Sequence, residues 1–253
     1  MAETFNRKNL DEREGDNLIS FQQIKLNDIS FSYSNSPNKI LEEISLQINL
    51  GDCIGIIGPS GSGKTTLVDL LLGLLSFQEG SIEYNGQLLD SKLEDWQSKV
   101  AYLPQEVFIM DETFRSNVAL ETDETNIDDL KVIKSIKKAR LKDFLDQLPQ
   151  GLNTTLGERG MRLSGGQRQR VALARAFYHE REVLVLDEAT SSLDTETEKE
   201  IVDEIRHLKG KATMLVVAHR LSTLQYCDRI YELKEGRLIK SGSPEEMLNL
   251  EKI

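Results

Sequence analysis

Residues 58–65 combine glycine, lysine and threonine in a spacing that suits a bound phosphate chain. This segment, GPSGSGKT, fits the pattern G-x-x-x-x-G-K-[ST]. Glycines let backbone N–H groups point at phosphate oxygens, and a helix that begins at Lys64 adds the positive end of its dipole. We expect Lys64 to reach the β and γ phosphates of a nucleotide, and the Thr65 hydroxyl to bind Mg²⁺. The alternative is a merely flexible turn, which needs neither the lysine nor the hydroxyl.

A pair of carboxylates supplies the second half of this chemistry. Asp187 and Glu188 end the segment VLVLDE, whose four apolar residues predict a buried strand. Parallel sheets with helices on both faces bind ligands at the carboxyl ends of their strands. We therefore expect Asp187 to contact Mg²⁺, directly or through water, and Glu188 to be the general base that polarises the attacking water. A buried strand followed by acidic residues is common and often only structural. Its occurrence together with the phosphate loop makes the prediction of a metal and catalytic site more specific.

The elements that must position these groups alternate between strand and helix. Apolar runs predict strands at residues 53–57, 99–104, 183–187 and 213–218, with two short strands around residues 234–236. Three helices are predicted in this core. One begins at about Lys64, a second ends at Tyr178, and a third covers the acidic residues 195–208. The alternation predicts an α/β core with helices on both faces of a sheet.

Two further parts flank this core. Residues 24–48 contain short alternating stretches that predict an N-terminal antiparallel β-subdomain, and SIEYNGQLL predicts a hairpin around Asn85 and Gly86. Residues 106–162 have helical patterns, notably at 127–148, and read as an inserted α-helical subdomain. Residues 1–18 read as a linker or flexible extension, so the folded domain is expected to cover residues 19–253.

Composition excludes several classes of protein. Lys and Arg total 31 against 42 for Asp and Glu, and the net charge of -11 disfavours a nucleic-acid partner. Cys53 and Cys227 lie in apolar segments without metal-ligand spacing, so we expect a reduced compartment and no disulfide. The longest nearly apolar run, residues 67–77, is shorter than the roughly 20 residues needed to cross a bilayer.

The segment LSGGQRQRVALARA, residues 163–176, resembles the signature motif of ATP-binding cassette proteins. It stands just before VLVLDEATSSLD, as in that family, and the resemblance extends from about Ile19 to the end of the chain. It implies a P-loop NTPase core of the RecA-like type that binds ATP and Mg²⁺. Other residues resemble family motifs in family order: Tyr33 the adenine-stacking aromatic, Gln105 the Q-loop glutamine, Asp194 the D-loop aspartate and His219 the switch histidine.

The resemblance implies a complete set of site residues. Lys64, Gln105, Glu188 and His219 are expected to be catalytic, and Thr65, Gln105 and Asp187 to hold the metal. Nucleotide contacts are expected from Tyr33, Gly58, Pro59, Ser60, Gly61, Ser62, Gly63, Lys64, Thr65, Thr66, Ser164, Gly165, Gly166, Gln167 and Asp194. By position alone, Tyr33 could equally be an ordinary strand aromatic and His219 a core histidine. His179 and His207 match no motif and are expected at the surface.

Ser164, Gly165 and Gly166 precede a predicted helix, so they form a second anion-binding helix start in one polypeptide. One nucleotide does not need two such cradles within a subunit. The resemblance implies that two copies pair head to tail, with the signature of each closing on the γ-phosphate held by the other. We expect the chain to be largely monomeric without nucleotide.

Segments between Gln105 and the signature, including GERG at residues 157–160, look like those of exporter-type cassettes. The implied function is to power substrate export or lipid flipping by a transmembrane domain, at the cytoplasmic face of a membrane. That domain is expected on the same native chain, although a separate subunit is the alternative. Three other readings compete: a chromosome-maintenance ATPase, a P-loop kinase that transfers phosphate to a small acceptor, and a nucleotide-binding adaptor without hydrolysis.

Overall fold

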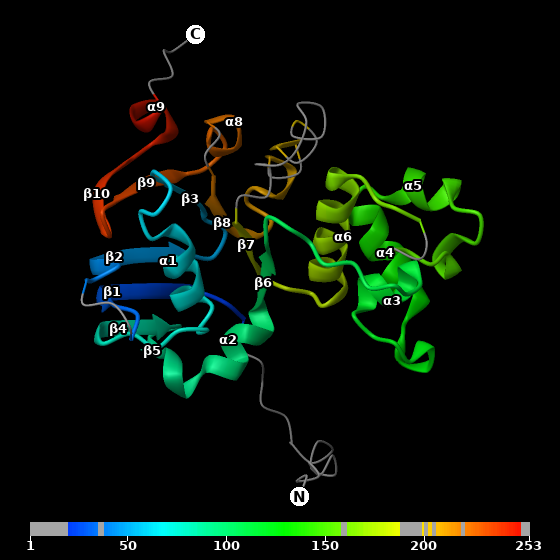
Figure 1. Ribbon diagram of the computed structural model, residues 1–253, viewed down its shortest axis with the longest axis horizontal. Coiled ribbons are helices and arrows are strands. Elements are labelled where there is room, and N and C mark those ends of the chain that lie inside the picture. The colour runs from blue at the N-terminus through cyan, green and yellow to red at the C-terminus, as the bar shows by residue number, and fades with distance from the viewer. Residues whose placement is uncertain are drawn as a thin grey trace, which may run out of the picture.

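The computed structural model describes residues 20–34, 38–157, 161–187, 199, 202–203, 206–218 and 221–248. In this part of the chain the strands form two sheets (Figure 1). One sheet has four strands in the order β2-β1-β4-β5, and the other has six in the order β10-β9-β3-β8-β7-β6. The first is the predicted antiparallel β-subdomain, and the second is the predicted α/β core.

The four-stranded sheet consists of β1 (Gln23–Phe31), β2 (Leu41–Asn49), β4 (Glu79–Tyr84) and β5 (Gln87–Leu88). Buried and exposed residues alternate along β2 because only one face of the sheet packs on the core. Asn85 and Gly86 have φ angles of 50° and 77°, the left-handed pair that a two-residue hairpin turn requires. The predicted hairpin is confirmed.

The six-stranded sheet is parallel except at one edge. It contains β3 (Cys53–Ile57), β6 (Val100–Leu103), β7 (Val183–Asp187), β8 (Thr213–Val217), β9 (Arg229–Lys234) and β10 (Arg237–Gly242). Only β10 runs antiparallel to its neighbour. Every residue of β7 and β8 is buried, which explains why these strands read as continuous apolar runs.

Helices α1 (Lys64–Leu71) and α6 (Gly165–Tyr178) cover opposite faces of the six-stranded sheet. Val183 and Val185 of β7 share a core with α1 and the four-stranded sheet. Leu184 and Leu186, which alternate with them, share a different core with α6. Helices therefore lie on both faces of the sheet, as the sequence predicts.

The remaining helices are short. Helices α3 (Phe114–Ala119), α4 (Asp129–Lys138) and α5 (Lys142–Gln147) gather beside α6, away from the four-stranded sheet (Figure 1). The helical pattern at residues 127–148 is divided in two, because Arg140 adopts a left-handed φ of 53° between α4 and α5. The other helices are α2 (Leu93–Lys99), α8 (Leu221–Leu224), α9 (Pro244–Met247) and the 3₁₀ helices Leu89–Ser91, Glu124–Asn126 and Gly151–Asn153.

Two sequence expectations can be compared with the structure only in part. Most of the predicted helix at residues 195–208 lies outside the described residues. Within the described part of the chain, no helix has both the length and the apolar character needed to cross a membrane.

Cys53 and Cys227 are free, buried thiols whose Sγ atoms lie 3.6 Å apart.

Candidate active site

The phosphate loop, residues 58–65, joins the carboxyl end of β3 to α1 and is closed tightly around two glycines. A Cβ atom at Gly58 would lie 2.1 Å from the Leu233 carbonyl oxygen, and one at Gly63 would lie 2.7 Å from the Leu41 side chain. Gly63 also has a left-handed φ of 104°, which glycine adopts without strain. Sterics therefore require glycine at both positions, even though glycine packs no core.

Lys64 and Ser62 are buried polar side chains of this loop. The Lys64 ammonium donates hydrogen bonds to the carbonyl oxygens of Gly58 and Pro59, each at 3.0 Å. The Ser62 hydroxyl is buried and has no hydrogen-bond partner among the described residues. A cation held by neutral carbonyls and a hydroxyl without a partner both fit a site whose missing ligand is an anion.

The start of α1 is open to such an anion. Its N-cap is Gly63, and no side chain forms a capping hydrogen bond there. The N–H groups of a first helical turn have no partners within the helix, so they remain available as donors. Thr65, in the same turn, is exposed and can present its hydroxyl, as predicted for a metal ligand.

Tyr33 lies beside the same helix. Its hydroxyl is 3.1 Å from the Thr66 hydroxyl, and its ring meets Phe31 edge to face at a centroid distance of 4.9 Å. Its side chain is large yet remains 43% exposed. An exposed aromatic ring next to the phosphate loop fits the predicted stacking on a base, which stays a prediction.

Asp187 ends β7 and is only 7% exposed. The Tyr102 hydroxyl donates a hydrogen bond of 3.0 Å to Asp187 Oδ2 from the neighbouring strand β6. Burial and the nearby carboxylate raise the pKa of Tyr102, so the phenol stays protonated and keeps donating. Sequence reasoning missed Tyr102, because its role depends on how strands β6 and β7 pair. Tyr102 lies opposite Val185, so its side chain is a diagonal neighbour of Asp187 two residues further along β7.

Gln105 is exposed and follows β6 after Pro104. The backbone carbonyls of both residues accept hydrogen bonds from the Gln169 side chain of α6, at 3.0 and 3.1 Å. Sequence reasoning missed Gln169 as well, since no local pattern places α6 against this segment.

The signature turn, residues 164–166, begins α6 but differs from the start of α1. The Ser164 hydroxyl accepts a hydrogen bond from the Gln167 backbone N–H, and the Gln167 side chain accepts one from the Ser164 N–H. This reciprocal arrangement is a capping box. The expected anion-binding turn is therefore present at a helix start, with part of its donor capacity taken up by the chain itself.

Three predicted site residues, Glu188, Asp194 and His219, lie outside the described residues. Glu188 follows Asp187 directly in the chain, and His219 comes two residues after β8 ends. His179 and His207 are exposed, in agreement with their expected surface positions.

The residues predicted to hold Mg²⁺ offer oxygen donors of three kinds. These are the Thr65 hydroxyl, the Gln105 amide and the Asp187 carboxylate, all at the carboxyl edge of the six-stranded sheet. Oxygen ligands are what Mg²⁺ prefers, and it usually takes few carboxylates together with substrate phosphates. Within the described residues, no group of three or more His, Cys, Asp or Glu side chains is placed to hold a metal. The donor set fits Mg²⁺ bound with a nucleotide.

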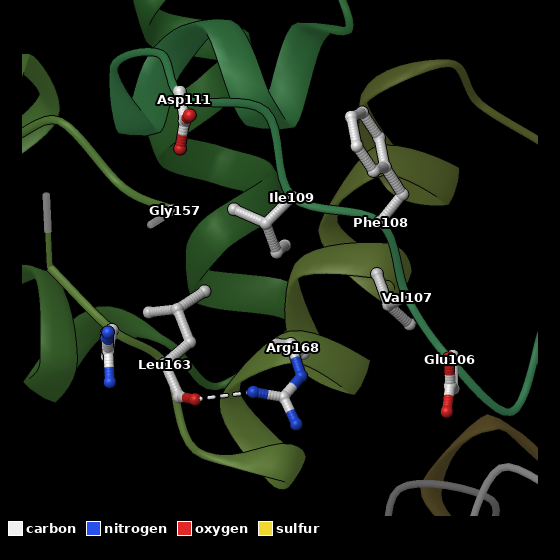
Figure 2. Close-up of a pocket in the computed structure, with 9 residues that line it drawn as sticks. Glu106, Val107, Phe108, Ile109, Asp111, Gly157, Leu163 and Arg168 are labelled. Atoms are coloured by element: carbon white, nitrogen blue, oxygen red, sulfur yellow. Dashed lines mark hydrogen bonds between the residues drawn. The ribbon is translucent and has the colours of Figure 1, made fainter. Parts of the chain in front are cut away.

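A cleft of about 860 Å³ lies between the segment after Gln105 and the residues around the signature turn. Figure 2 shows Ile109 and Leu163 lying toward one another across it, and Arg168 donating to the Leu163 carbonyl. Phe108, at its edge, is 74% exposed. A smaller cleft of about 370 Å³ shares Phe108 and includes Leu120, which is 53% exposed. Both clefts therefore have an exposed apolar side chain in their lining.

The fold and the site together define a P-loop protein with an α/β core, an antiparallel β-subdomain and a helical insert. Comparison with known protein families identifies the family. The family described as ABC transporter matches residues 41–191, which are more than half of the chain. The chain belongs to the ABC transporter family and carries its ATPase domain.

Relatives that match almost the whole chain are themselves longer proteins. The ATP-dependent lipid A-core flippase of Desulfotalea psychrophila is 40% identical over 243 residues, which are 95% of this chain and 42% of the relative. That of Ralstonia nicotianae is 38% identical over 244 residues, 96% of this chain and 40% of the relative. A solved bacterial Atm1-family ABC exporter with ATP bound matches with a TM-score of 0.80 and 33% identity, covering 93% of this chain and 41% of that one. The chain thus spans about two fifths of the relatives it matches.

Proposed function

We propose that two copies of this domain pair head to tail around ATP, hydrolyse it, and thereby drive export or lipid flipping by a transmembrane partner. One observation carries the pairing: the two anion-binding helix starts belong to helices that pack on opposite faces of the six-stranded sheet. A nucleotide held at the start of α1 by one copy is then completed by the signature turn of the other. Pairing gives both turns a use.

The chain's own residues divide the chemistry among them. Lys64 neutralises charge on the β and γ phosphates, and the open first turn of α1 orients them. Thr65, Gln105 and Asp187 would hold Mg²⁺, which would supply positive charge to offset that of the phosphates. Tyr102 keeps the Asp187 carboxylate in place through its hydrogen bond. Glu188 orients and polarises the attacking water, while His219 contacts the γ-phosphate.

The transmembrane partner is proposed to dock on the clefts beside Phe108. Phe108 and Leu120 present exposed apolar surface there, and Arg168 lines the larger cleft near the signature turn. Contact at this place would link the partner to the segment that carries Gln105. We propose that the partner lies on the same native chain, because the matched relatives are more than twice as long, and that the domain works at the cytoplasmic face of a membrane.

The deciding experiment is Glu188→Gln, measured by ATP turnover and by light scattering. The proposal expects ATP binding to persist, turnover to fall by at least about 100-fold, and a dimer to accumulate with ATP. Glu180→Gln is the matched control, since Glu180 is an exposed glutamate just before β7.

Three outcomes would count against the proposal. Wild-type turnover in Glu188→Gln would remove Glu188 as the base. A stable dimer without nucleotide would remove the ATP dependence of pairing. Phosphate transferred to an acceptor other than water would favour a kinase.

A further inference from the structure

Gln169 is a buried polar residue in the second turn of α6. Its side chain is 4% exposed, and its amide nitrogen bridges the carbonyl oxygens of Pro104 and Gln105. These consecutive carbonyls belong to the segment that leaves the six-stranded sheet after β6 and enters the helical region. One side chain thereby fastens that segment to the signature helix.

Stability alone does not explain an amide at this position. The Gln169 side-chain oxygen is buried without a hydrogen-bond partner among the described residues. Leaving a buried acceptor unpaired is unfavourable, and this cost offsets much of what the two donated bonds contribute. The neighbouring core of α6 is apolar, with Val171, Ala172 and Leu173 all buried. An apolar side chain would suit such surroundings, so the bridge itself is the distinctive contribution of Gln169.

We infer that Gln169 is a positioning residue that ties the backbone of Gln105 to the signature turn, so that each moves with the other. The signature turn and Gln169 lie within the first two turns of one helix, and a helix transmits displacement as a rigid element. This inference rests on the proposed function, in which Gln105 serves one nucleotide and the signature turn serves the nucleotide of the partner copy. Gln169 then links two reaction centres through a single chain.

The link is tested first in the nucleotide-free chain by NMR relaxation of the backbone amides. Gln169→Met removes both donors at nearly constant volume, and Gln169→Leu serves if the methionine variant does not fold. Loss of the two hydrogen bonds to the carbonyl oxygens of Pro104 and Gln105 should free this backbone, so the amide order parameters of residues 105–107 should fall from about 0.85 toward about 0.6. Ser135→Ala is the matched control, because Ser135 is also buried and loses one hydrogen bond, to Lys131 within α4. Its order parameters at residues 105–107 should match those of wild type.

The second readout separates positioning from a general loss of structure. In Gln169→Met, the affinity of the single chain for fluorescent ATP should stay within about twofold, since the phosphate loop is untouched, while kcat falls by about tenfold. Pairing around two ATP molecules predicts that turnover of the wild-type chain rises sigmoidally with ATP concentration, and Gln169→Met should weaken this sigmoidal shape. Ser135→Ala should leave the kcat and the shape of this curve unchanged.

Unchanged order parameters at residues 105–107 in both Gln169 variants would overturn the inference. It would also be overturned if Gln169→Met lost activity only in proportion to its loss of folded protein. Failure of the proposed function looks different: the wild-type chain would then neither pair nor hydrolyse ATP. The relaxation measurement needs no nucleotide and decides the link in that case too.

Discussion

The starts of α1 and α6 are both glycine-rich turns, yet they treat their own hydrogen-bond donors differently. At α1 the N-cap is a left-handed glycine, and no side chain caps the helix. At α6 Ser164 and Gln167 satisfy one another in a capping box. The first turn is open before any ligand arrives, whereas the second is partly closed by its own chain.

This difference implies an order of events. The open turn at α1 can take up phosphate without rearrangement, so one copy should set the affinity for ATP. An anion that recruits the backbone N–H of Gln167 competes with a helix cap that stabilises the chain by about 1 kcal/mol. The signature turn should therefore respond when a second copy presents a γ-phosphate. The experiments that follow test this division of labour.

The largest expected effect is at the open turn. Lys64→Ala removes the buried cation of the phosphate loop, so turnover should fall by at least about 100-fold and binding of fluorescent ATP by the single chain should weaken strongly. Lys240→Ala, at an exposed position of β10, is the control. Unaltered ATP binding in Lys64→Ala would remove the contrast between the two helix starts.

The next effect separates the capping role of Ser164 from its role toward a nucleotide. Ser164→Ala should lower stability by about 1 kcal/mol and leave ATP binding by the single chain unchanged. Turnover should fall by about tenfold or more, because the partner's nucleotide loses a donor.

Ser243→Ala is its matched control. Ser243 forms the same kind of capping box with Glu246 at the start of α9, away from the site. It should show a similar fall in thermal midpoint with normal turnover. If Ser164→Ala and Ser243→Ala lost turnover equally, the role of Ser164 would be only to cap its helix.

A smaller effect is expected at Tyr102, which hydrogen-bonds to Asp187, the predicted metal ligand. Tyr102→Phe removes the hydrogen bond to Asp187, so Mn²⁺ binding in the presence of ADP, followed by electron paramagnetic resonance, should weaken by about tenfold. The Mg²⁺ concentration needed for turnover should rise in parallel. Tyr231→Phe, on β9, should behave as wild type, and equal Mn²⁺ affinity in both variants would leave Tyr102 without a positioning role.

The smallest effect concerns an acid that only one of the two helices carries. Burial raises the pKa of Asp69 in α1, whereas α6 has no acidic residue. A raised carboxyl pKa penalises the folded state at neutral pH, and the penalty fades as the pH falls through that pKa. Asp69→Asn should therefore raise the thermal midpoint at pH 7, and the difference from wild type should vanish near pH 4. A difference that does not depend on pH would contradict this origin.

Much of the fold can be read from local patterns in the chain. The strand-loop-helix order around the phosphate loop, the apolar run of β7 and the Asn85–Gly86 hairpin each depend on residues close in sequence, and the structure confirms all three. The capping box of α6 is equally local, since the pattern S-x-x-Q formed by Ser164 and Gln167 predicts it. The anion-binding turn predicted there shares two of its backbone donors, the N–H groups of Ser164 and Gln167, with this capping box.

The amino-acid sequence by itself determined which chemical groups the site contains, because phosphate binding depends on a short loop and the helix that follows it. Only the tertiary structure decided which groups act on one another. Tyr102 meets Asp187 across 85 positions of sequence, and Gln169 meets Gln105 across 64. Such contacts depend on the order and register of packed strands and helices, which emerge from burial of the whole core and from no single segment.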